Sequence, residues 1–206
     1  VKPVILVKVG RHPAGAKAAL SHTAALVGAD NVFNAAVNRV GAVRVQTVTQ
    51  LFTAAKALSL NFCQFGNRLA IVTNGGGPGV MAADRAADLG LVLAPLAAAT
   101  LQYLDQHLPQ HWSRGNPVDI IGDAGADRYH HAVKACLEDE NVDGVLAILT
   151  PQAMSAPLES AQALIALAGG HCKPLLACWM GETQIASARQ AFAKAKIPHF
   201  RTPEPA

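Results

Sequence analysis

Short runs of β-branched and aliphatic residues alternate with helix-length amphipathic segments along this sequence. The clearest run, 144–150, precedes a helical pattern at 157–168. Such alternation is typical of right-handed βαβ units, which build a parallel sheet. The other predicted strands are 3–9, 43–45, 68–74, 91–94, 174–179 and 198–201, and the other predicted helices are 31–40, 47–58, 78–89, 97–107, 127–140 and 183–195. The five strands after residue 60 predict an α/β fold with a flavodoxin-like doubly wound parallel sheet.

The composition excludes several classes of protein. Hydrophobic residues make up 51% of the 206 residues, and charged residues make up 15%. This apolar content excludes a disordered chain, and the length is sufficient for a packed core. The longest apolar stretch, 89–99, is broken by Gly90 and Pro95 and is shorter than the ~20 residues of a membrane span. The net charge of +3 is spread along the chain, so nucleic-acid binding is not expected.

The cysteines predict neither a metal site nor a redox dithiol. Cys63, Cys136, Cys172 and Cys178 contain no Cys-x-x-Cys pair, whereas both kinds of site need two thiolates close together. Cys136 falls in a helical pattern and Cys178 in a strand, where a thiol packs as a small apolar side chain. The expected compartment is the reducing cytoplasm.

The start of the sequence is unusual. It begins with Val1 rather than Met and enters the apolar strand 3–9 almost at once. We interpret this start as a cut made inside a larger protein. Strand 3–9 would then have an apolar edge without its original neighbour, so we expect it to pair with another copy of the chain or to pack irregularly, and we expect an oligomer.

An irregular stretch divides the sequence. A small-residue loop at 11–15 and the segments after it give a β-loop-α-β-α order up to residue 58, and the pattern is then interrupted at 60–67. On the helix predicted at 47–58, Thr47 is the expected N-cap and Val48, Leu51, Phe52, Ala55 and Leu58 are the expected inward side chains. We therefore expect two domains, at 1–60 and 61–206.

The strongest local motif is a run of glycines between a strand and a helix. Strand 68–74 runs directly into Gly75, Gly76, Gly77 and Gly79. Glycines let the backbone turn several N–H groups toward one point, and the dipole of the following helix favours negative charge. The motif therefore predicts an anion site, although a tight turn that needs glycine for geometry alone is an equal alternative. It is neither a Walker A loop nor a Gly-x-Gly-x-x-Gly fingerprint.

His22 is the second candidate, because it lies among small residues after a strand. A neutral imidazole nitrogen is a competent nucleophile toward phosphoryl groups, and histidine exchanges protons near pH 7. Taken alone, a histidine that is merely hydrogen-bonded in a loop is the more frequent situation. His22 by itself therefore does not establish a catalytic site.

Weaker candidates follow other predicted strands. Pro117 keeps Asn116 out of the helical region, which is expected to expose the Asn116 side chain in a ligand-facing loop with Asp119. The segments 150–155 and 179–182 also follow strands at the edge where ligands of open parallel sheets bind. Each of these segments is more often a plain loop.

Five segments, taken in order, resemble the nucleoside-diphosphate-forming acyl-CoA synthetases, the relatives of succinyl-CoA synthetase. They are Lys-Val-Gly-Arg at 8–11, Ser-His-Thr-Ala-Ala-Leu-Val-Gly at 21–28, Thr-Asn-Gly-Gly-Gly-Pro-Gly at 73–79, Asn-Pro-Val-Asp at 116–119 and Ile-Pro-His-Phe-Arg-Thr-Pro-Glu at 197–204. The resemblance runs from end to end of the chain. It departs at Ala24, where the family commonly has glycine.

The resemblance implies a role for each segment. His22 would be the histidine that is transiently phosphorylated. The implied phosphate-binding residues are Asn74, Gly75, Gly76, Gly77 and Gly79, and the expected ligand-facing residues are Ser21, Thr23, Asn116 and Asp119. Domain 1–60 would be the C-terminal portion of the phosphohistidine-bearing domain, and 61–206 would be the flavodoxin-like ligase-CoA domain.

The implied reaction forms acyl-CoA from a carboxylic acid, CoA and ATP through an acyl phosphate and a phosphohistidine. CoA, ATP or ADP, and Mg²⁺ would serve the full-length enzyme, with none bound to this fragment, which we expect to be inactive alone. The expected partners are CoA-binding and ATP-grasp domains of the parent chain or of another subunit.

Two alternatives remain. The same region occurs as a regulatory, acyl-CoA-sensing module fused to a GNAT domain in Pat-type protein lysine acetyltransferases, in which the phosphorylated histidine is often lost. His22 therefore favours the ligase. The third interpretation is a flavodoxin-like binding domain without catalysis.

Overall fold

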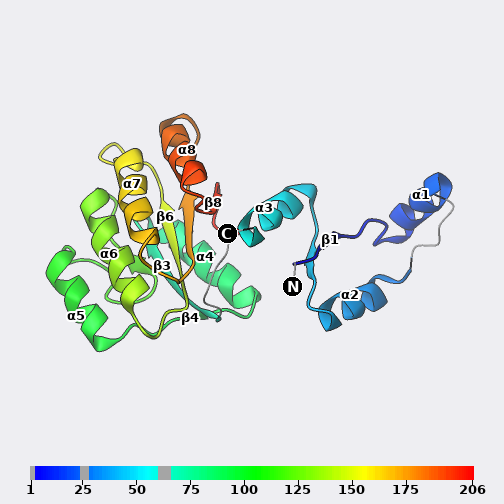
Figure 1. The fold of residues 1–206 in the computed structure, drawn as a ribbon, viewed down its shortest axis with the longest axis horizontal. Coiled ribbons are helices and arrows are strands. Elements are labelled where there is room, and N and C mark those ends of the chain that lie inside the picture. The colour runs from blue at the N-terminus through cyan, green and yellow to red at the C-terminus, as the bar shows by residue number, and fades with distance from the viewer. Residues whose placement is uncertain (1–2, 24–27, 60–65) are drawn as a thin grey trace. The chain divides into compact units, whose positions relative to one another are not determined.

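The computed structural model describes residues 3–23, 28–59 and 66–206. The chain divides into two compact units, Val1–Asn61 and Phe62–Ala206. Both units contain parallel strands joined by helices, as Figure 1 shows. The α/β fold class predicted from the alternating pattern is confirmed.

The first unit is a small parallel βαβ arrangement. Its described elements are β1 (Ile5–Val7), α1 (Pro13–Thr23), α2 (Asp30–Arg39), β2 (Val43–Val45) and α3 (Val48–Leu58). β1 pairs with β2, with Ile5 opposite Val43. β2 covers one edge of β1, and the expectation that its other edge pairs with another copy or packs irregularly stays a prediction.

Helix α1 replaces a predicted loop. The segment 11–15 was expected to be irregular because of its glycine and proline, but Pro13 begins a helix that continues to Thr23. Proline is favoured in the first turn of a helix, and the alanines that follow have the highest helix propensity. These preferences outweigh the single glycine at Gly15.

Helix α3 begins as the sequence predicts. The Thr47 side chain accepts a hydrogen bond from the Gln50 N–H, and the Gln50 side chain accepts one from the Thr47 N–H, which forms a capping box. The prediction for its apolar face is right for Leu51, which is half-buried, and wrong for Val48, Phe52, Ala55 and Leu58, which are exposed. Val48 is 62% exposed and Phe52 is 70% exposed, because no other layer of the described residues covers that face.

The second unit contains a longer series of elements. They are β3 (Arg68–Thr73), α4 (Gly76–Asp88), β4 (Val92–Leu93), α5 (Ala98–His107), β5 (Val118–Asp119), α6 (Ala126–Glu138), β6 (Gly144–Leu149), α7 (Pro157–Ala168), β7 (Leu175–Trp179), the 3₁₀ turn η1 (Thr183–Ile185), α8 (Ala186–Lys194) and β8 (His199–Phe200). The parallel sheet has the order β4-β3-β6-β7-β8. Numbered within the unit without the short strand β5, which pairs with β3 off this path, the order is 2-1-3-4-5, the flavodoxin-like order that the sequence predicts.

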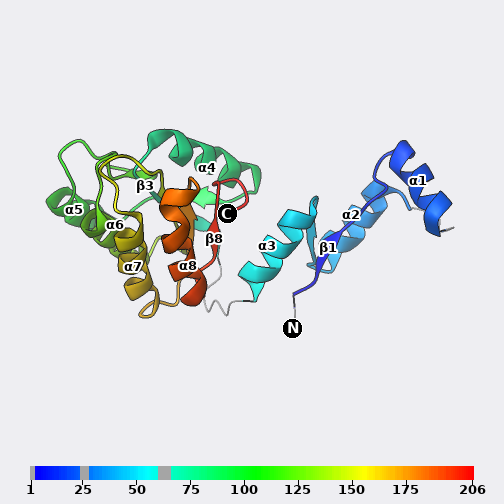
Figure 2. The same cartoon turned by 90° about the horizontal axis from the view of Figure 1, so that it is seen from above.

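Helices cover both faces of this sheet. Figure 2 shows α4 on one side of the strands and α6, α7 and α8 on the other. The larger core lies on the second side and includes Tyr129, Trp179 and Phe192, all fully buried. On the α4 side, Ala82 packs near Ile71. The sheet is therefore enclosed, and its strand ends are the natural place for a site.

The short strand β5 was not predicted. It pairs with the carboxyl end of β3, through Val72 and Val118, whereas β4 pairs with the amino end of the same edge. The Asn116 side chain lies between these two pairings. Its amide donates to the carbonyl oxygens of Leu69 and Ala94, and its oxygen accepts from the Ile71 N–H. Asn116 thereby supplies the hydrogen bonds that a continuous strand would have made.

Candidate functional site

Loops from four strands of the second unit meet at the carboxyl edge of its sheet. The end of β3 is joined to the end of β6 by hydrogen bonds between Asn74 and Thr150. The end of β7 is joined to the end of β6, because the Met180 N–H donates to the Leu149 carbonyl oxygen at 2.9 Å. This edge is where ligands of open parallel sheets bind.

The side chain of Thr73 holds the turn at 73–79, called the glycine turn below. Its hydroxyl group donates to the Gly75 carbonyl oxygen at 2.8 Å and accepts from the Gly75 N–H at 3.0 Å. Thr73 is fully buried, so the turn is anchored to the core. Helix α4 begins directly after Gly75, two residues earlier than predicted, and Pro78 lies in its first turn.

The start of α4 presents backbone N–H groups that no N-cap side chain satisfies. Gly75 is the N-cap and has no side chain, and the N–H groups of Gly76 and Gly77 precede the first intrahelical bonds. Both residues are exposed. These N–H groups and the positive end of the helix dipole favour an anion at this position.

The four glycines have two different roles. A Cβ on Gly75 would lie 2.8 Å from the Thr150 hydroxyl oxygen, and a Cβ on Gly79 would lie 2.9 Å from Thr73 Cγ2. These two positions therefore need glycine for packing. A Cβ on Gly77 would contact nothing within 4 Å. Gly75 and Gly79 thus fit the interpretation of a tight turn that needs glycine for geometry, whereas Gly77 leaves room for an anion.

Asn74 is a structural residue of the site. It is 2% exposed, and its oxygen accepts hydrogen bonds from the Thr150 N–H at 2.8 Å and from the Thr150 hydroxyl at 3.0 Å. Its amide donates to the Thr150 carbonyl oxygen at 2.9 Å. The side chain therefore fixes the turn after β3 to the end of β6.

Asp119 places a carboxylate beside the glycine turn. Its Oδ1 accepts from the Ile121 N–H at 2.9 Å, and its Oδ2 would lie 3.5 Å from a Cβ on Gly76. The ligand-facing role expected for Asp119 stays a prediction. The carboxylate interacts favourably with the start of α4 and would repel a second anion brought to the same N–H groups.

Asn116 does not lie where the sequence predicted. Its side chain was expected to be exposed in a ligand-facing loop, but it is turned into the sheet and bonds to strand backbone. Proline does exclude the helical conformation at the preceding residue, as expected. That restriction sets the backbone of Asn116 and not the direction of its side chain, which the unpaired backbone groups between β4 and β5 determine.

Two arginines, neither of which the sequence singled out, hold loops at this edge. Arg189 of α8 donates to the carbonyl oxygens of Trp179 and Gly181 after β7. Arg128 of α6 donates to the Ile120 carbonyl oxygen and pairs with Asp123, and this ion pair holds the pKa of Asp123 below its usual 3.8. The sequence around a helical arginine does not predict that its side chain will bond to the backbone of a loop.

The remaining predicted residues lie in the first unit. Ser21 is on α1, exposed, and its hydroxyl donates to the Ala18 carbonyl oxygen at 2.7 Å. The backbone of His22 and Thr23 belongs to the last turn of α1, and their side chains lie outside the described residues. The roles of these three residues stay predictions.

Metal ligands do not gather in the described part of the chain. Among residues 3–23, 28–59 and 66–206, no group of three His, Cys, Asp or Glu side chains is placed to hold a metal ion. Cys136 and Cys178 are buried, and burial raises the pKa of each thiol to about 12, so neither is a thiolate near neutral pH. Cys63 lies outside the described residues. No helix among the described residues is long and apolar enough to cross a bilayer.

Comparison with known families gives two matches along the chain. Residues 1–58 match the succinyl-CoA ligase like flavodoxin domain. Residues 69–204, well over half of the chain, match the Ligase-CoA domain. The chain belongs to the Ligase-CoA family. The resemblance noted from the five sequence segments is confirmed.

Relatives of this Ligase-CoA chain are similar to it over nearly its whole length. The ADP-forming acetate–CoA ligase I of Archaeoglobus fulgidus is 40% identical over 98% of this chain and 28% of its own length. The alpha subunit of the ADP-forming acetate–CoA ligase II of Pyrococcus furiosus is 35% identical over 98% of this chain and 45% of its own. This chain therefore spans less than half the length of either relative.

A solved structure has the same fold. The dinucleotide-forming acetyl-coenzyme A synthetase 1 of Ca. Korarchaeum cryptofilum, in complex with phosphate and ADP, superimposes with a TM-score of 0.91. It is 32% identical, and the match covers 98% of this chain and 44% of that one. The Ligase-CoA fold assigned above thus agrees with an experimentally determined one.

Proposed function

We propose that this chain is part of an ADP-forming acyl-CoA synthetase. The whole enzyme would convert a carboxylic acid, CoA and ATP into acyl-CoA, ADP and phosphate through an acyl phosphate. The observation that carries the proposal is the turn after β3, where the exposed N–H groups of Gly76 and Gly77 begin a helix on a buried anchor. The relatives named above are all ligases or synthetases, which favours this function over the acetyltransferase module.

In this proposal the glycine turn binds a phosphoryl group. Gly76 and Gly77 donate backbone N–H groups, and the positive end of the α4 dipole adds to the attraction. Asn74, Gly75 and Gly79 contribute by holding the turn, through the contacts with Thr150 and Thr73. The N–H groups need no reorganisation when the anion arrives, because the turn is already fixed.

His22 would carry the phosphoryl group between sites. A neutral imidazole nitrogen attacks the γ-phosphorus of ATP, and ADP leaves. A carboxylate oxygen of the acid then attacks the phosphohistidine, whose N–P bond breaks to give the acyl phosphate. The CoA thiolate finally attacks the acyl carbon, and inorganic phosphate leaves. Ser21 and Thr23 flank it on α1. Asp119 would limit the residence of the dianion at the turn by like-charge repulsion.

The proposal requires partners. CoA, the adenine nucleotide and Mg²⁺ would bind to CoA-binding and ATP-grasp domains, in the same polypeptide or in another subunit. This chain spans 28% to 45% of the relatives named above, which leaves room for both domains in proteins of that size. The exposed apolar side chains of the first unit would suit a packed domain neighbour.

A phosphoryl-transfer experiment tests the proposal. The protein, with its CoA-binding and ATP-grasp partners, is incubated with Mg²⁺ and ATP labelled on the γ-phosphate. We expect an acid-labile, base-stable label that His22→Ala abolishes and that His12→Ala, a change of an exposed histidine in the same unit, leaves intact. Absence of label in the unchanged protein would refute the ligase function.

A second pair of variants tests the turn. Gly77→Asp would place a carboxylate at the N–H groups and lower the labelled fraction by like-charge repulsion. Gly77→Ala, which adds a methyl group where nothing lies within 4 Å, should label normally. Equal labelling of the two variants would show that the turn does not bind the phosphoryl group.

A further inference from the structure

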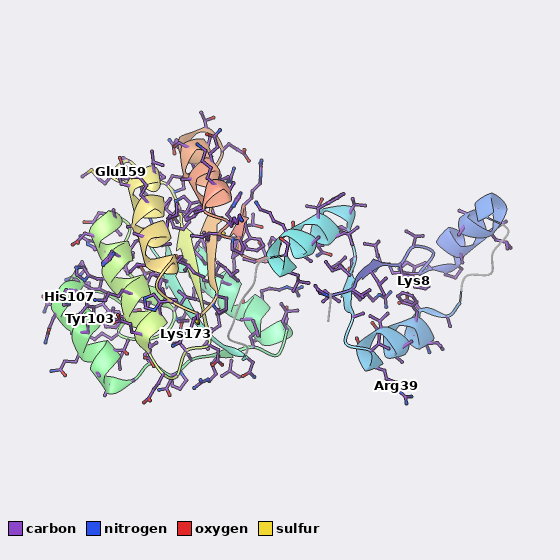
Figure 3. All side chains as sticks on the ribbon, in the orientation of Figure 1. Lys8, Arg39, Tyr103, His107, Glu159 and Lys173 are labelled. Carbon is purple, nitrogen blue, oxygen red and sulfur yellow. The ribbon has the colours of Figure 1, made fainter. Side chains whose placement is uncertain are left out.

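A tyrosine and three histidines form a cluster on helices α5 and α6, apart from the glycine turn. Tyr103 and His107 lie together on α5, as Figure 3 shows, and their rings stack with centroids 4.0 Å apart. The His131 ring of α6 lies 4.3 Å from that of His107, and the His130 ring lies 5.6 Å from that of His131. None of these side chains has a part in the function proposed above.

One hydrogen bond and one charge contact give this cluster a direction. The Tyr103 hydroxyl oxygen lies 2.7 Å from His131 Nδ1, and His131 Nε2 lies 3.5 Å from an Asp127 carboxylate oxygen. The negative charge of Asp127 on the Nε2 side favours the ring proton of neutral His131 on that nitrogen. Nδ1 then carries the lone pair and accepts the phenol proton. The order carboxylate, imidazole, hydroxyl is that of an oriented base beside a nucleophile.

His107 supports the arrangement from the other side. Its Nδ1 lies 2.8 Å from the Tyr103 carbonyl oxygen, which can only accept, so this nitrogen carries the proton. The exposed His107 ring is therefore fixed over one face of the Tyr103 ring. The phenol is held in a single orientation toward His131.

The other tyrosine of the chain provides a contrast. Tyr129 is fully buried, and its hydroxyl donates to the Ile148 carbonyl oxygen at 2.8 Å. Burial raises the pKa of Tyr129 well above 10, and a carbonyl oxygen cannot take its proton. Tyr103, by comparison, is partly exposed and faces a base.

We propose that Tyr103 is a modification site that accepts an acyl group from an activated acyl donor of the acyl phosphate class, with His131 as its general base. This inference goes beyond the ligase function and rests on it for the acyl donor, because an acyl phosphate is the intermediate of the proposed reaction. The site itself uses neither the glycine turn nor His22. Its chemistry depends only on residues of α5 and α6.

The step balances without an oxidant or a metal. The Tyr103 oxygen attacks the carbonyl carbon of the acyl phosphate while its proton passes to His131 Nδ1. The bond between the carbonyl carbon and the phosphate oxygen breaks, and inorganic phosphate leaves with the electron pair. The imidazolium, stabilised by Asp127, then gives the proton to phosphate or water. The product is a tyrosine ester and a restored His131.

His131 is suited to act as a base at neutral pH. Partial burial lowers the pKa of His131, and the positive charges of His107, His130 and Lys134 lower it further, whereas Asp127 opposes this shift. The imidazole is therefore neutral near pH 7 and above, and its Nδ1 lone pair is available there.

Mass spectrometry of the 206-residue chain tests this site, with acetyl phosphate as the probe. We expect one acetyl group on the peptide that contains Tyr103 and none on the peptide that contains Tyr129. His131→Gln should slow the labelling by about 100-fold, the usual contribution of a general base. The matched variant His111→Gln, a change of an exposed histidine outside this cluster, should label at the rate of the unchanged chain.

The pH dependence of labelling provides a test without any substitution. With His131 as base, the rate should be nearly constant between pH 7.5 and 9. An unassisted phenol would label about tenfold faster for each pH unit up to about 10, because only the phenolate would react. That steep rise, a His131→Gln variant that labels at the unchanged rate, or label found on Tyr129 would overturn the proposal.

Discussion

The two units of this chain bury their apolar side chains to different extents. In the described part of the first unit, Val37 is the one hydrophobic side chain that is fully enclosed, and Val9, Val40 and Phe52 are at least 70% exposed. In the second unit, α5 to α8 enclose one face of the sheet and α4 covers the other. Apolar periodicity is similar in both regions. It becomes a core only where the topology supplies a second layer.

This difference affects the candidate sites. The glycine turn of the second unit is fixed by fully buried Thr73 and nearly buried Asn74. In the first unit, α1 and its predicted phosphoryl carrier His22 have no comparable core beneath them among the described residues. This contrast is consistent with the proposed function, in which the glycine turn is a fixed phosphoryl-binding site and His22 transfers the phosphoryl group between sites.

The largest expected difference concerns two phenylalanines on helices. Phe192 of α8 is fully buried, so Phe192→Ala should lower the free energy of unfolding by about 3–5 kcal/mol. Phe52 of α3 is 70% exposed, so Phe52→Ala should change it by less than about 0.5 kcal/mol. Urea unfolding followed by far-UV circular dichroism measures both. Equal losses would show that the first unit has a core of its own.

A smaller difference is expected for two glycines. Gly75→Ala in the second unit brings a methyl group within 2.8 Å of the Thr150 hydroxyl, and it should cost about 1–3 kcal/mol. Gly28→Ala in the first unit meets nothing within 4 Å, so it should be neutral or slightly stabilising. Thermal unfolding of the two variants checks this order. A neutral Gly75→Ala would mean that the turn is looser than its contacts indicate.

The smallest expected effect is on stability in acid. Arg44 lowers the pKa of Asp30 in the first unit, and Arg128 lowers that of Asp123 in the second. Because each folded-state pKa lies below 3.8, each carboxylate stabilises its unit fully above that pH and loses this contribution as the pH falls further. Asp30→Asn and Asp123→Asn should each weaken the pH dependence of unfolding below about pH 4. An unchanged pH profile in either variant would show that its ion pair does not contribute to stability in acid.

Much of the fold could be predicted from the sequence. Helix α7 has the predicted ends, Pro157 and Ala168, because proline in its first turn and the glycine after it mark both of them. The sheet order followed from the number and spacing of the strands. Helix α1 is not predicted, because small residues at 11–15 are also typical of a loop, although the propensity of the alanines favours a helix.

Less of the site could be predicted. The glycine motif located the turn, but the sequence did not show that Gly75 and Gly79 serve packing while Gly77 is open. Those roles depend on Thr150 and Thr73, and Thr150 is distant in sequence. The inward direction of Asn116 likewise depends on backbone groups of β3 and β4 that the short strand β5 leaves unpaired. Long-range contacts of this kind leave no local signal.

The central claim is that the exposed N–H groups at the start of α4 bind a phosphoryl anion. A titration of the ¹⁵N-labelled chain with inorganic phosphate, followed by amide chemical shifts, tests it directly. The account predicts saturable shifts of the Gly76 and Gly77 amides, little change at Gly169 on a distant turn, and loss of the response in Gly77→Asp. Unshifted Gly76 and Gly77 amides, or an equal response in Gly77→Asp, would contradict it.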